Sequence, residues 1–541
     1  MLKKFSIMVM VFVLLIAVSV TAQDVTLSPP GEFPIVSEPV TLRVLMLGHP
    51  IVEDFQTNLF TEWYTNRTGI QVEFTVAPPS EEREILNLTL ASGELPDVIV
   101  GFTIDPSMLA IYGAQGTFLP LNDLIEEQGY YIKEVFEGSP QVKPLITSPD
   151  GNIYGLPQVN ECFHCFYSQK MWINQTWLDN LNLELPQTTE EFFNVLMAFK
   201  EQDANGNGDP NDEIPLAASP TGWNSNLDGF LMNPFVYNER GFNGSNEFLV
   251  LEDGVISSVV DTEEWREGLR YLKRLYDAGL FGEESFTQEP DQLRQMVEGG
   301  ETPIVGAIPA GAQSVFANIG EPRWHDYVAV PPLEGPNGVR QTPYNPWGIV
   351  SGQCVISATT PYPEVAFRWC DGQYEREATM NALYGAEGEA WEWAEEGEIG
   401  LDGGPAIWRR LSTFGTLQNI HWGQRGPTYR PSYLRLGEVQ RFDVAGLEVV
   451  LFAETNEKMK PYARAQENVI PPLAYTTDQA TELAELRLAL GDYVRQMEAE
   501  FILGRADLDS GWESYVATLN SLGLPRLVEI NQEAYDALFG S

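Results

Sequence analysis

Three strand-like segments decide the fold of this chain: TLRVLML at residues 41–47, QVEFTV at 71–76 and DVIV at 97–100. The helix predicted after the first strand has Phe60, Trp63 and Tyr64 on one face, and residues 81–92 predict a second helix. Strands and helices that alternate in this order build a parallel sheet with helices on both faces. The sequence therefore predicts an α/β fold.

Candidate ligand contacts follow these strands directly. His49 comes after the first strand, and Phe102 and Asp105 come after the third. Because α/β sheets bind ligands at the carboxyl ends of their strands, all three are candidates for a binding site. The alternative is that each is structural or simply solvated, as most single histidines and aspartates are.

A loop of eleven residues, DANGNGDPNDE at 203–213, carries oxygen-bearing side chains at alternating positions. Calcium takes roughly six to eight oxygens, which such loops supply from alternate residues around a glycine that permits a sharp turn. The candidate ligands are Asp203, Asn205, Asn207 and Asp209, with Asp212 or Glu213 closing the site. Ile214 stands where an EF-hand has its glutamate, so we expect an EF-like calcium loop outside a true EF-hand. The alternative is a metal-free turn.

An amphipathic helix precedes this loop. Thr188 and Glu191 have the spacing of a capping box, which marks where a helix begins. The apolar side chains that follow recur at helical spacing: Phe192, Val195, Leu196 and Phe199. We therefore expect the loop to tie the end of a helix to the strand predicted at 214–218.

Composition and the amino terminus indicate an exported chain with more than one lobe. The 541 residues exceed the usual size of a single core, and the net charge of −45 argues against nucleic acid as a partner. Residues 1–22 read as a signal peptide cut after Ala22, with an uncleaved membrane anchor as the alternative. The Pro-rich residues 23–39 predict a tether, and the absence of cysteine near the cleavage site argues against a lipid anchor.

Four cysteines in an exported chain suggest disulfides. Cys162 could pair with Cys165, and Cys354 with Cys370, although the sequence leaves the connectivity open. The alternative for the first pair is a zinc or redox site, but no second pair of cysteines or histidines at metal-binding spacing accompanies it.

Ordered segments along the chain carry a family resemblance: LASGELPD (90–97), YGAQG (112–116), LPLNDL (119–124), DGNIYGLP (150–157), PLEGPNG (332–338), PEVAFRW (363–369), YGAEG (384–388) and FILG (501–504). Together they resemble family 1 extracellular solute-binding proteins of ABC importers. With the calcium loop, the chain is most similar to the subgroup of alginate-binding and related oligosaccharide-binding lipoproteins. It departs from that subgroup in lacking the lipobox cysteine, which puts membrane attachment in doubt.

This resemblance implies a two-lobed periplasmic-binding-protein type II fold with a hinge and a cleft between the lobes. Lobe one would take residues 40–165 and 345–410, and lobe two residues 166–344 and 411–541. The protein would act as a monomer that captures an oligosaccharide in the cleft, closes around it and delivers it to an ABC transporter permease. Calcium would be structural.

Sugar sites need aromatic platforms and polar rims. Trp223 and the adjacent Asn224 lie on a Gly/Pro-rich loop, Trp347 lies at an expected lobe crossing, and Trp422 follows His421. We name all three tryptophans as candidate platforms. Core packing is the alternative for each of them.

Residues 403–437 contain five arginines and no acidic residue. Because the guanidinium fork matches carboxylates and sulfates, Arg425 and Arg430 favour an acidic oligosaccharide as the ligand. The alternative is that these arginines pair with the many carboxylates elsewhere in the chain.

Two other functions compete with transport: a secreted polysaccharide-degrading enzyme and a surface adhesion module that binds carbohydrate. The sequence contains no hydrolase or phosphate-binding motif, and acidic residues are too numerous for a catalytic pair to stand out. We therefore expect a binding protein rather than an enzyme.

Overall fold

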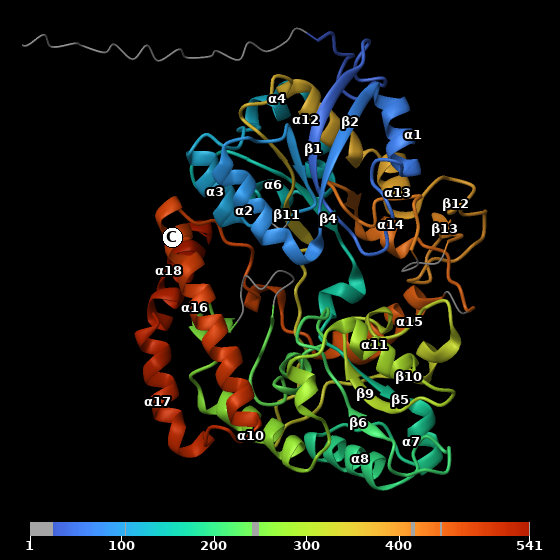
Figure 1. The fold of residues 1–541 in the computed structure, drawn as a ribbon, viewed down its shortest axis with the longest axis vertical. Helices are drawn as coiled ribbons and strands as arrows, with labels where there is room; N and C mark the ends of the chain where they lie inside the picture. The colour runs from blue at the N-terminus through green and yellow to red at the C-terminus, as the bar shows by residue number, and fades with distance from the viewer. Residues whose placement is uncertain (1–24, 103, 241–247, 413–416, 444–445, 540–541) are drawn as a thin grey trace, which may run out of the picture.

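The computed structural model describes residues 25–102, 104–240, 248–412, 417–443 and 446–539. They form two α/β lobes, one above the other in Figure 1. The predicted signal peptide, residues 1–22, lies outside the described residues. None of the helices within these ranges is long and apolar enough to cross a bilayer.

Lobe one is built on a six-stranded sheet with the order β14-β4-β11-β3-β1-β2. Its strands are β1 (Val40–Leu47), β2 (Ile70–Ala77), β3 (Val98–Val100), β4 (Leu156–Asn160), β11 (Ile349–Ile356) and β14 (Tyr429–Arg430). β1 is parallel to β2 and β3, β14 is parallel to β4, and β11 is antiparallel to both of its neighbours. The carboxyl ends of β1, β3, β4 and β14 therefore meet at one edge, which points toward lobe two (Figure 1).

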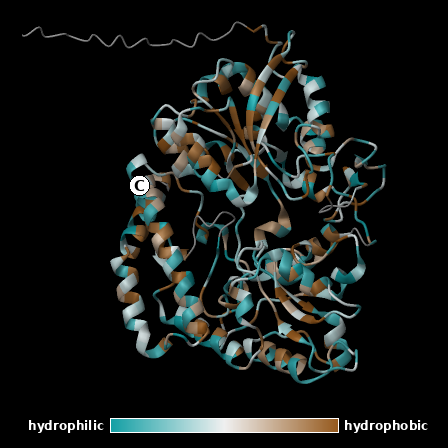
Figure 2. Ribbon diagram, viewed as in Figure 1, coloured by the Kyte–Doolittle hydropathy of each residue, from teal (hydrophilic) through white to brown (hydrophobic). Residues whose placement is uncertain are grey.

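Both faces of this sheet are covered by helices. They are α1 (Leu59–Thr68), α2 (Glu82–Ser92), α3 (Pro106–Ala114), α4 (Asn122–Gln128), α5 (Tyr131–Gly138), α6 (Val142–Leu145), α12 (Pro363–Asp371), α13 (Arg376–Tyr384) and α14 (Ser432–Leu436). In β1, Val44 and Met46 pack into one core cluster and Leu45 and Leu47 into another. A strand buried on both faces needs such an unbroken apolar run, seen as brown strands in Figure 2.

Lobe two has a four-stranded sheet with the order β10-β5-β9-β6. The strands are β5 (Met171–Asn174), β6 (Ile214–Leu216), β9 (Val305–Pro309) and β10 (Tyr327–Val330). Its helices are α7 (Gln175–Leu181), α8 (Thr189–Glu201), α9 (Leu227–Leu231), α10 (Glu263–Asp277), α11 (Pro290–Glu298) and α15 (Leu447–Glu454). Two short hairpins, β7–β8 (Leu249–Glu252 and Val255–Ser258) and β12–β13 (Trp391–Trp393 and Trp408–Arg410), stand outside the large sheets.

Three long helices close the chain: α16 (Thr477–Ile502), α17 (Leu508–Ser521) and α18 (Leu524–Phe539). Their apolar side chains, such as Leu483, Tyr515 and Ile530, are part of the core of lobe two. α16 also packs beside α3 of lobe one, on the left of Figure 1. The C-terminal helices thus belong to one lobe and touch the other.

Local sequence signals set the ends of these elements as predicted. α1 ends at Gly69, whose φ of 77° lies in the left-handed region that glycine adopts without strain. α8 begins with the predicted capping box, in which the Thr188 side chain accepts from Glu191 N–H and the Glu191 carboxylate accepts from Thr188 N–H. The predicted α/β class and the parallel β1–β3 unit are confirmed.

Two predicted boundaries differ from the structure. Residues 25–39 are packed against lobe one rather than extended as a tether: Ile35 and Val36 are core residues, and the Arg368 guanidinium donates to the carbonyls of Ser28 and Pro29. The predicted change from lobe one to lobe two at residue 410 comes too early, because β14 (Tyr429–Arg430) pairs with β4 in the sheet of lobe one. A two-residue strand is too short to show periodicity.

Two segments of the chain that cross between the lobes, called crossings below, meet the sheet of lobe one at its lower edge in Figure 1. The first, η2 (Phe163–Tyr167), joins β4 to β5, and the second, residues 331–348, joins β10 to β11.

Both cysteine pairs that the sequence suggested are disulfides, Cys162–Cys165 in the first crossing and Cys354–Cys370 in the core of lobe one. With both sulfurs of Cys162–Cys165 bonded to each other, no thiolate is left for zinc beside His164.

Candidate functional site

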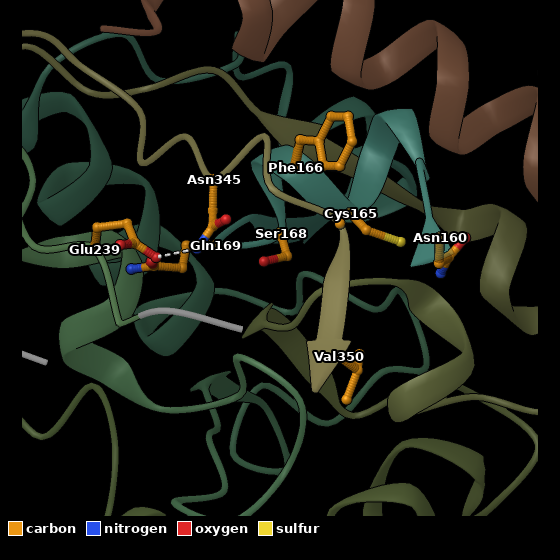
Figure 3. Close-up of a pocket in the computed structure, with 9 residues that line it drawn as sticks. Asn160, Cys165, Phe166, Ser168, Gln169, Glu239, Asn345 and Val350 are labelled. Carbon is orange, nitrogen blue, oxygen red and sulfur yellow. Dashed lines mark hydrogen bonds between the residues drawn. The ribbon is translucent and has the colours of Figure 1, made fainter. Parts of the chain in front are cut away.

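A pocket lies where the two crossings meet (Figure 3). It contains about 430 Å³ of space that protein atoms do not fill, part of it open to solvent. The residues that line it come from the end of β4, from the first crossing and the residues just after it, from the loop after α9, and from the second crossing and the start of β11: Asn160, Cys165, Phe166, Ser168, Gln169, Glu239, Asn345, Gly348 and Val350. The pocket is therefore formed by segments of both lobes.

Backbone hydrogen bonds hold the two crossings together beneath this pocket. Asn160 N–H donates to the Gly348 carbonyl over 2.7 Å, and Asn345 N–H donates to the Phe166 carbonyl over 2.8 Å. Gly348 has a φ of 56°, and a Cβ there would lie 2.7 Å from the Asn160 carbonyl oxygen. Only glycine allows the strands to approach this closely, so the floor of the pocket is fixed by the backbone.

Polar groups of the pocket suit a hydroxyl-rich ligand. Asn345 Nδ2 donates to Glu239 Oε1 over 3.3 Å, which orients both side chains (Figure 3). Asn160 Oδ1 is buried and has no hydrogen-bond partner among the described residues. Because an unpaired buried acceptor costs free energy, a donor from a ligand would stabilise this site. The Phe166 ring adds an apolar surface to the same wall.

A buried ionic cluster lies beside the first crossing. Glu448 of α15 is 3.4 Å from His164 Nε2 and 3.3 Å from Arg435 Nη2 of α14. Burial alone would raise the pKa of Glu448, but the charges of Arg435 and His164 outweigh burial and hold that pKa well below its usual range. This cluster joins an element of each lobe to the crossing between them.

The carboxyl ends of β1 and β3 carry a second group of polar residues. Arg425 Nη2 donates to the Gly48 carbonyl over 2.7 Å, and His49 lies against Gly423, where a Cβ would be 2.9 Å from the imidazole Cγ. Burial and the charge of Arg425 lower the pKa of His49 to about 4, so the imidazole is neutral at pH 7. The structure thus brings His49 and Arg425 together as strand-end residues.

Two candidate ligand contacts are corrected because their side chains are core residues. Phe102 is 0% exposed and packs among Leu45, Ile99 and other side chains of lobe one. Trp422 is 1% exposed, stands edge-on to Phe60 with ring centroids 4.8 Å apart, and donates from Nε1 to Thr61 Oγ1. Each aromatic ring fills core volume that a sugar ring cannot reach.

Asp105 has a structural role in the present conformation. Its Oδ1 accepts from the N–H groups of Ser107 and Met108, which makes it the N-cap of α3. A carboxylate at this position satisfies donors that the helix itself cannot pair.

The remaining tryptophan candidates are partly buried near the crossings. Trp223 covers Gly311, where a Cβ would lie 2.4 Å from the indole ring, and its ring is 6.3 Å from that of His164. Asn224 follows with a φ of 51°. Trp347, in the second crossing, donates from Nε1 to the Ile470 carbonyl over 3.0 Å. Their contact with a ligand stays a prediction.

The arginines of residues 403–437 fall into two groups. Arg409 pairs with Glu392 and Glu398, Arg410 with Glu438, and Arg435 with Glu448, as the alternative interpretation expected. Arg425 and Arg430 form no ion pair with a carboxylate anywhere in the described ranges. Arg430 is 2% exposed, and its Nη2 donates to Gln424 Oε1 over 3.0 Å.

The loop at 203–213 has the turns that a calcium loop requires. Asp203 Oδ2, Asn205 Oδ1 and Asn207 Oδ1 accept from the N–H groups of Gly208, Asn207 and Asp209, respectively. Asp212 accepts from the side chains of Asn205 and Asn207, and Glu213 Oε1 accepts from backbone N–H groups of the same loop. Asp203 Oδ1 and Glu213 Oε2 are buried without a hydrogen-bond partner in the described chain. Oxygen ligands alone, two of them unpaired, fit a hard cation.

Sequence reasoning missed most of the pocket. Asn160, Phe166, Glu239 and Asn345 belong to no motif: Asn160 ends a strand, Phe166 and Asn345 lie in the crossings, and Glu239 lies in a loop. One signal was available: Asn345 is in the segment YNPWG at 344–348, which nominated only its tryptophan as a candidate.

Comparison with known proteins agrees with this architecture. Residues 58–383 match the model of the bacterial extracellular solute-binding protein family. The fructooligosaccharide ABC transporter substrate-binding protein FusA of Streptococcus pneumoniae serotype 4 is 26% identical over 520 residues, 93% of this chain and 91% of FusA. The polygalacturonan/rhamnogalacturonan-binding protein YtcQ of Bacillus subtilis (strain 168) is 25% identical over 248 residues, 44% of each chain.

Solved structures extend the comparison to the fold. FusA in complex with kestose has a TM-score of 0.78 at 25% identity, covering 92% of this chain and 99% of FusA, and an EF-hand mutant of FusA gives the same values. The alginate-binding protein AlgQ2 without calcium ion has a TM-score of 0.70 at 21% identity, covering 93% and 100%, and shows the fold alone. The two-lobed fold is confirmed, and this chain belongs to the family of bacterial extracellular solute-binding proteins.

Proposed function

We propose that this chain captures an oligosaccharide between its two lobes and delivers it to the permease of an ABC transporter. The observation that carries the proposal is the pocket at the crossings, lined by residues of both lobes. A ligand that contacts both lobes binds the closed form better than the open form, and so shifts the population toward closure. FusA, related along nearly the whole chain, is a fructooligosaccharide transporter subunit.

Within the pocket, Asn160, Glu239 and Asn345 would hydrogen-bond to sugar hydroxyls. Phe166 offers an apolar surface for the C–H face of a sugar ring. Trp223 and Trp347, which do not line the pocket but lie near the crossings, would offer further ones, and Asn224 adds a polar group beside Trp223. His49, Asp105 and Arg425 lie on the strand-end side of lobe one, where a longer ligand would extend. Phe102 and Trp422 support this surface from the core.

We propose calcium as a structural cofactor of the loop at 203–213. Asp203, Asn205, Asn207, Asp209, Asp212 and Glu213 would hold it. A bound cation would pair the buried oxygens of Asp203 and Glu213 and so fix the connection between α8 and β6. FusA has been solved as an EF-hand mutant, which supports a similar loop in that relative.

Export and a monomeric, non-enzymatic role complete the proposal. The apolar residues 5–20 followed by Ala22 support a cleaved signal peptide, and the chain has no cysteine there for lipid attachment. FusA, which matches along nearly the whole chain, is an ABC transporter substrate-binding protein. Incubation with kestose or oligogalacturonate should therefore yield no shorter sugars by chromatography, and the appearance of fragments would favour the alternative of a polysaccharide-degrading enzyme.

Calorimetric titration of the purified protein with neutral and acidic oligosaccharides tests the proposal. We expect saturable binding of at least one of them, accompanied by a change in tryptophan fluorescence. Replacing Asn345 by Ala should weaken that binding about tenfold, because Glu239 loses the hydrogen bond from Asn345 and the ligand loses a donor. Asn66→Ala, on the exposed face of α1, is the control and should leave binding unchanged. Binding that Asn345→Ala does not affect would contradict the placement of the site.

A further inference from the structure

The loop at residues 422–426 holds the positively charged side chain of Arg425 at the carboxyl end of the sheet of lobe one. Trp422 anchors it in the core of lobe one, and Gln158 Nε2 of β4 donates to the Gln424 carbonyl over 2.8 Å. Gly423, Gln424 and Gly426 have φ values of 61°, 75° and 90°. A glutamine in this left-handed region is strained by about 1 kcal/mol or more, and such strain persists where the surroundings impose it. The fold therefore fixes the position of Arg425.

The guanidinium of Arg425 rests on the backbone of lobe one and forms no ion pair with a carboxylate of the described residues. Its stem lies on Gly101, where a Cβ would be 2.9 Å from Arg425 Cδ, and its Nη2 donates to the Gly48 carbonyl. Its Nε is buried without a hydrogen-bond partner in the described chain. Burial lowers the pKa of Arg425, and the charge of Glu82 partly opposes this effect.

The histidines near Arg425 add no charge of their own at pH 7. His49 and His421 have pKa values lowered to about 4, chiefly by burial, so both are neutral at pH 7. Arg430 is a second arginine without a carboxylate, and it positions the loop through Gln424. In a chain of net charge −45, two partly or fully buried arginines that form no ion pair with a carboxylate of the described residues are unusual, since a buried charge normally has a partner.

The position of Arg425 relative to the pocket sets the size of a ligand that could reach both. Asn160 ends β4, Gly48 follows β1, and β11 and β3 lie between these two strands. With neighbouring strands about 4.8 Å apart, the two ends are separated by about 14 Å along the sheet edge. A single sugar ring is too short to span this distance, whereas a chain of several linked rings can.

We infer that Arg425 receives an anionic group, a carboxylate or a sulfate, of an oligosaccharide whose other part occupies the pocket at the crossings. This inference rests on the proposed function and narrows its ligand to the acidic class. The guanidinium would form charge-assisted hydrogen bonds with the anion through nitrogens that no carboxylate of the described residues occupies. Arg425 is then a specificity residue, and Arg430 a positioning residue.

Trigalacturonate and its fully methyl-esterified form test this inference, because they share rings and linkages and differ in charge. A glycan array that carries uronic, sulfated and neutral oligosaccharides shows first whether the protein prefers another acidic sugar, which then replaces trigalacturonate. We expect the charged form to bind at least tenfold more tightly than the ester. Its affinity should fall as sodium chloride rises, whereas that of the ester should not.

Arg425→Gln should weaken binding of the charged sugar about ten- to a hundredfold and leave the ester nearly unchanged. Arg425→Lys, which keeps the charge, should recover part of the loss. Arg409→Gln, in the same basic segment but paired with Glu392 and Glu398, is the matched control and should bind like the parent. The melting temperature of each variant shows whether loss of the bond to Gly48 has unfolded the site.

The outcomes separate the inference from the proposed function. Binding confined to neutral oligosaccharides, or binding of acidic ones that a folded Arg425→Gln variant retains in full, would overturn the inference and leave the proposed function standing. Absence of binding to every glycan would overturn both.

Discussion

Arg410 and Glu438 form a buried ion pair that we expect to matter for stability. Their side chains are 8% and 6% exposed, and two hydrogen bonds of 2.9 and 3.1 Å make the contact bidentate. Removing one partner of a buried pair leaves an uncompensated charge, which costs about 3–5 kcal/mol. Glu438→Gln should therefore lower the free energy of unfolding by about 3 kcal/mol in urea denaturation.

The exposed pair of Arg526 and Glu529 provides the control for that experiment. Its side chains are 37% and 60% exposed, and pairs of this kind contribute about 0–1 kcal/mol. Glu529→Gln should consequently change the unfolding free energy by less than about 1 kcal/mol. Equal losses in the two variants would show that burial does not determine the strength of the first pair.

Gly311 shows how one residue can control a candidate binding surface. A Cβ at this position would lie 2.4 Å from the Trp223 ring, so alanine must displace the indole. If Trp223 stacks on a sugar, Gly311→Ala should weaken oligosaccharide binding several-fold while the circular dichroism spectrum stays the same. Gly254→Ala, in an open hairpin turn, should leave binding intact. Unchanged affinity in a folded Gly311→Ala variant would remove Trp223 from the proposed site.

At the scale of elements, the loop at 203–213 connects α8 to β6. A cation there would bind the folded loop only, and a ligand that binds only the folded state stabilises it. We expect EDTA to lower the melting temperature of the protein by several degrees and added calcium to restore it. Asp203→Asn should abolish the effect of EDTA. A melting temperature of the parent protein that neither EDTA nor calcium changes would contradict the calcium site.

The cluster of Glu448, His164 and Arg435 links α14, α15 and the first crossing. Because the pKa of Glu448 is lower in the folded than in the unfolded chain, its contribution to stability is present above the ordinary glutamate pKa of about 4.3 and is lost as pH falls below it. As pH falls from 5 to 3, the free energy of unfolding should decline less steeply in Glu448→Gln than in the parent. Parallel declines would show that this carboxylate does not contribute to acid sensitivity.

At the scale of the whole molecule, the proposed function requires the two lobes to close around the ligand. Ligand-induced closure should reduce the radius of gyration in X-ray scattering, with a profile that returns to the starting one after dialysis. A surface adhesion module would bind without this change. The contact of α16 with α3 spans the lobes on the side away from the β12–β13 hairpin, so hydrogen exchange in α3 should change on closure.

Sequence patterns predicted this fold well where the signal was local. The capping box of Thr188 and Glu191, the Gly69 helix stop and the apolar run of β1 each depend on residues close in the chain. The two-residue strand β14 and the packing of Ile35 and Val36 escaped prediction because their stabilising partners are distant in sequence.

The candidate site was less predictable, since the same residue types serve in the core and at the surface. Trp422 and Trp223 were equal candidates by sequence, yet the first packs among Phe55, Phe60 and Trp369 and the second lies partly exposed over Gly311. The arginine segment behaved similarly: Arg410 pairs with Glu438, whereas Arg425 has no carboxylate partner among the described residues.

The sequence by itself determined the α/β class, the first three strands with the helices between them, and the family, because these depend on periodicity, spacing and ordered motifs, and it predicted the EF-like loop. Only the tertiary structure decided that Asn160, Glu239 and Asn345 share one pocket and that Arg425 lies over the end of β1. Such contacts join residues far apart in the chain, and they arise from strand order and packing, which no local pattern records.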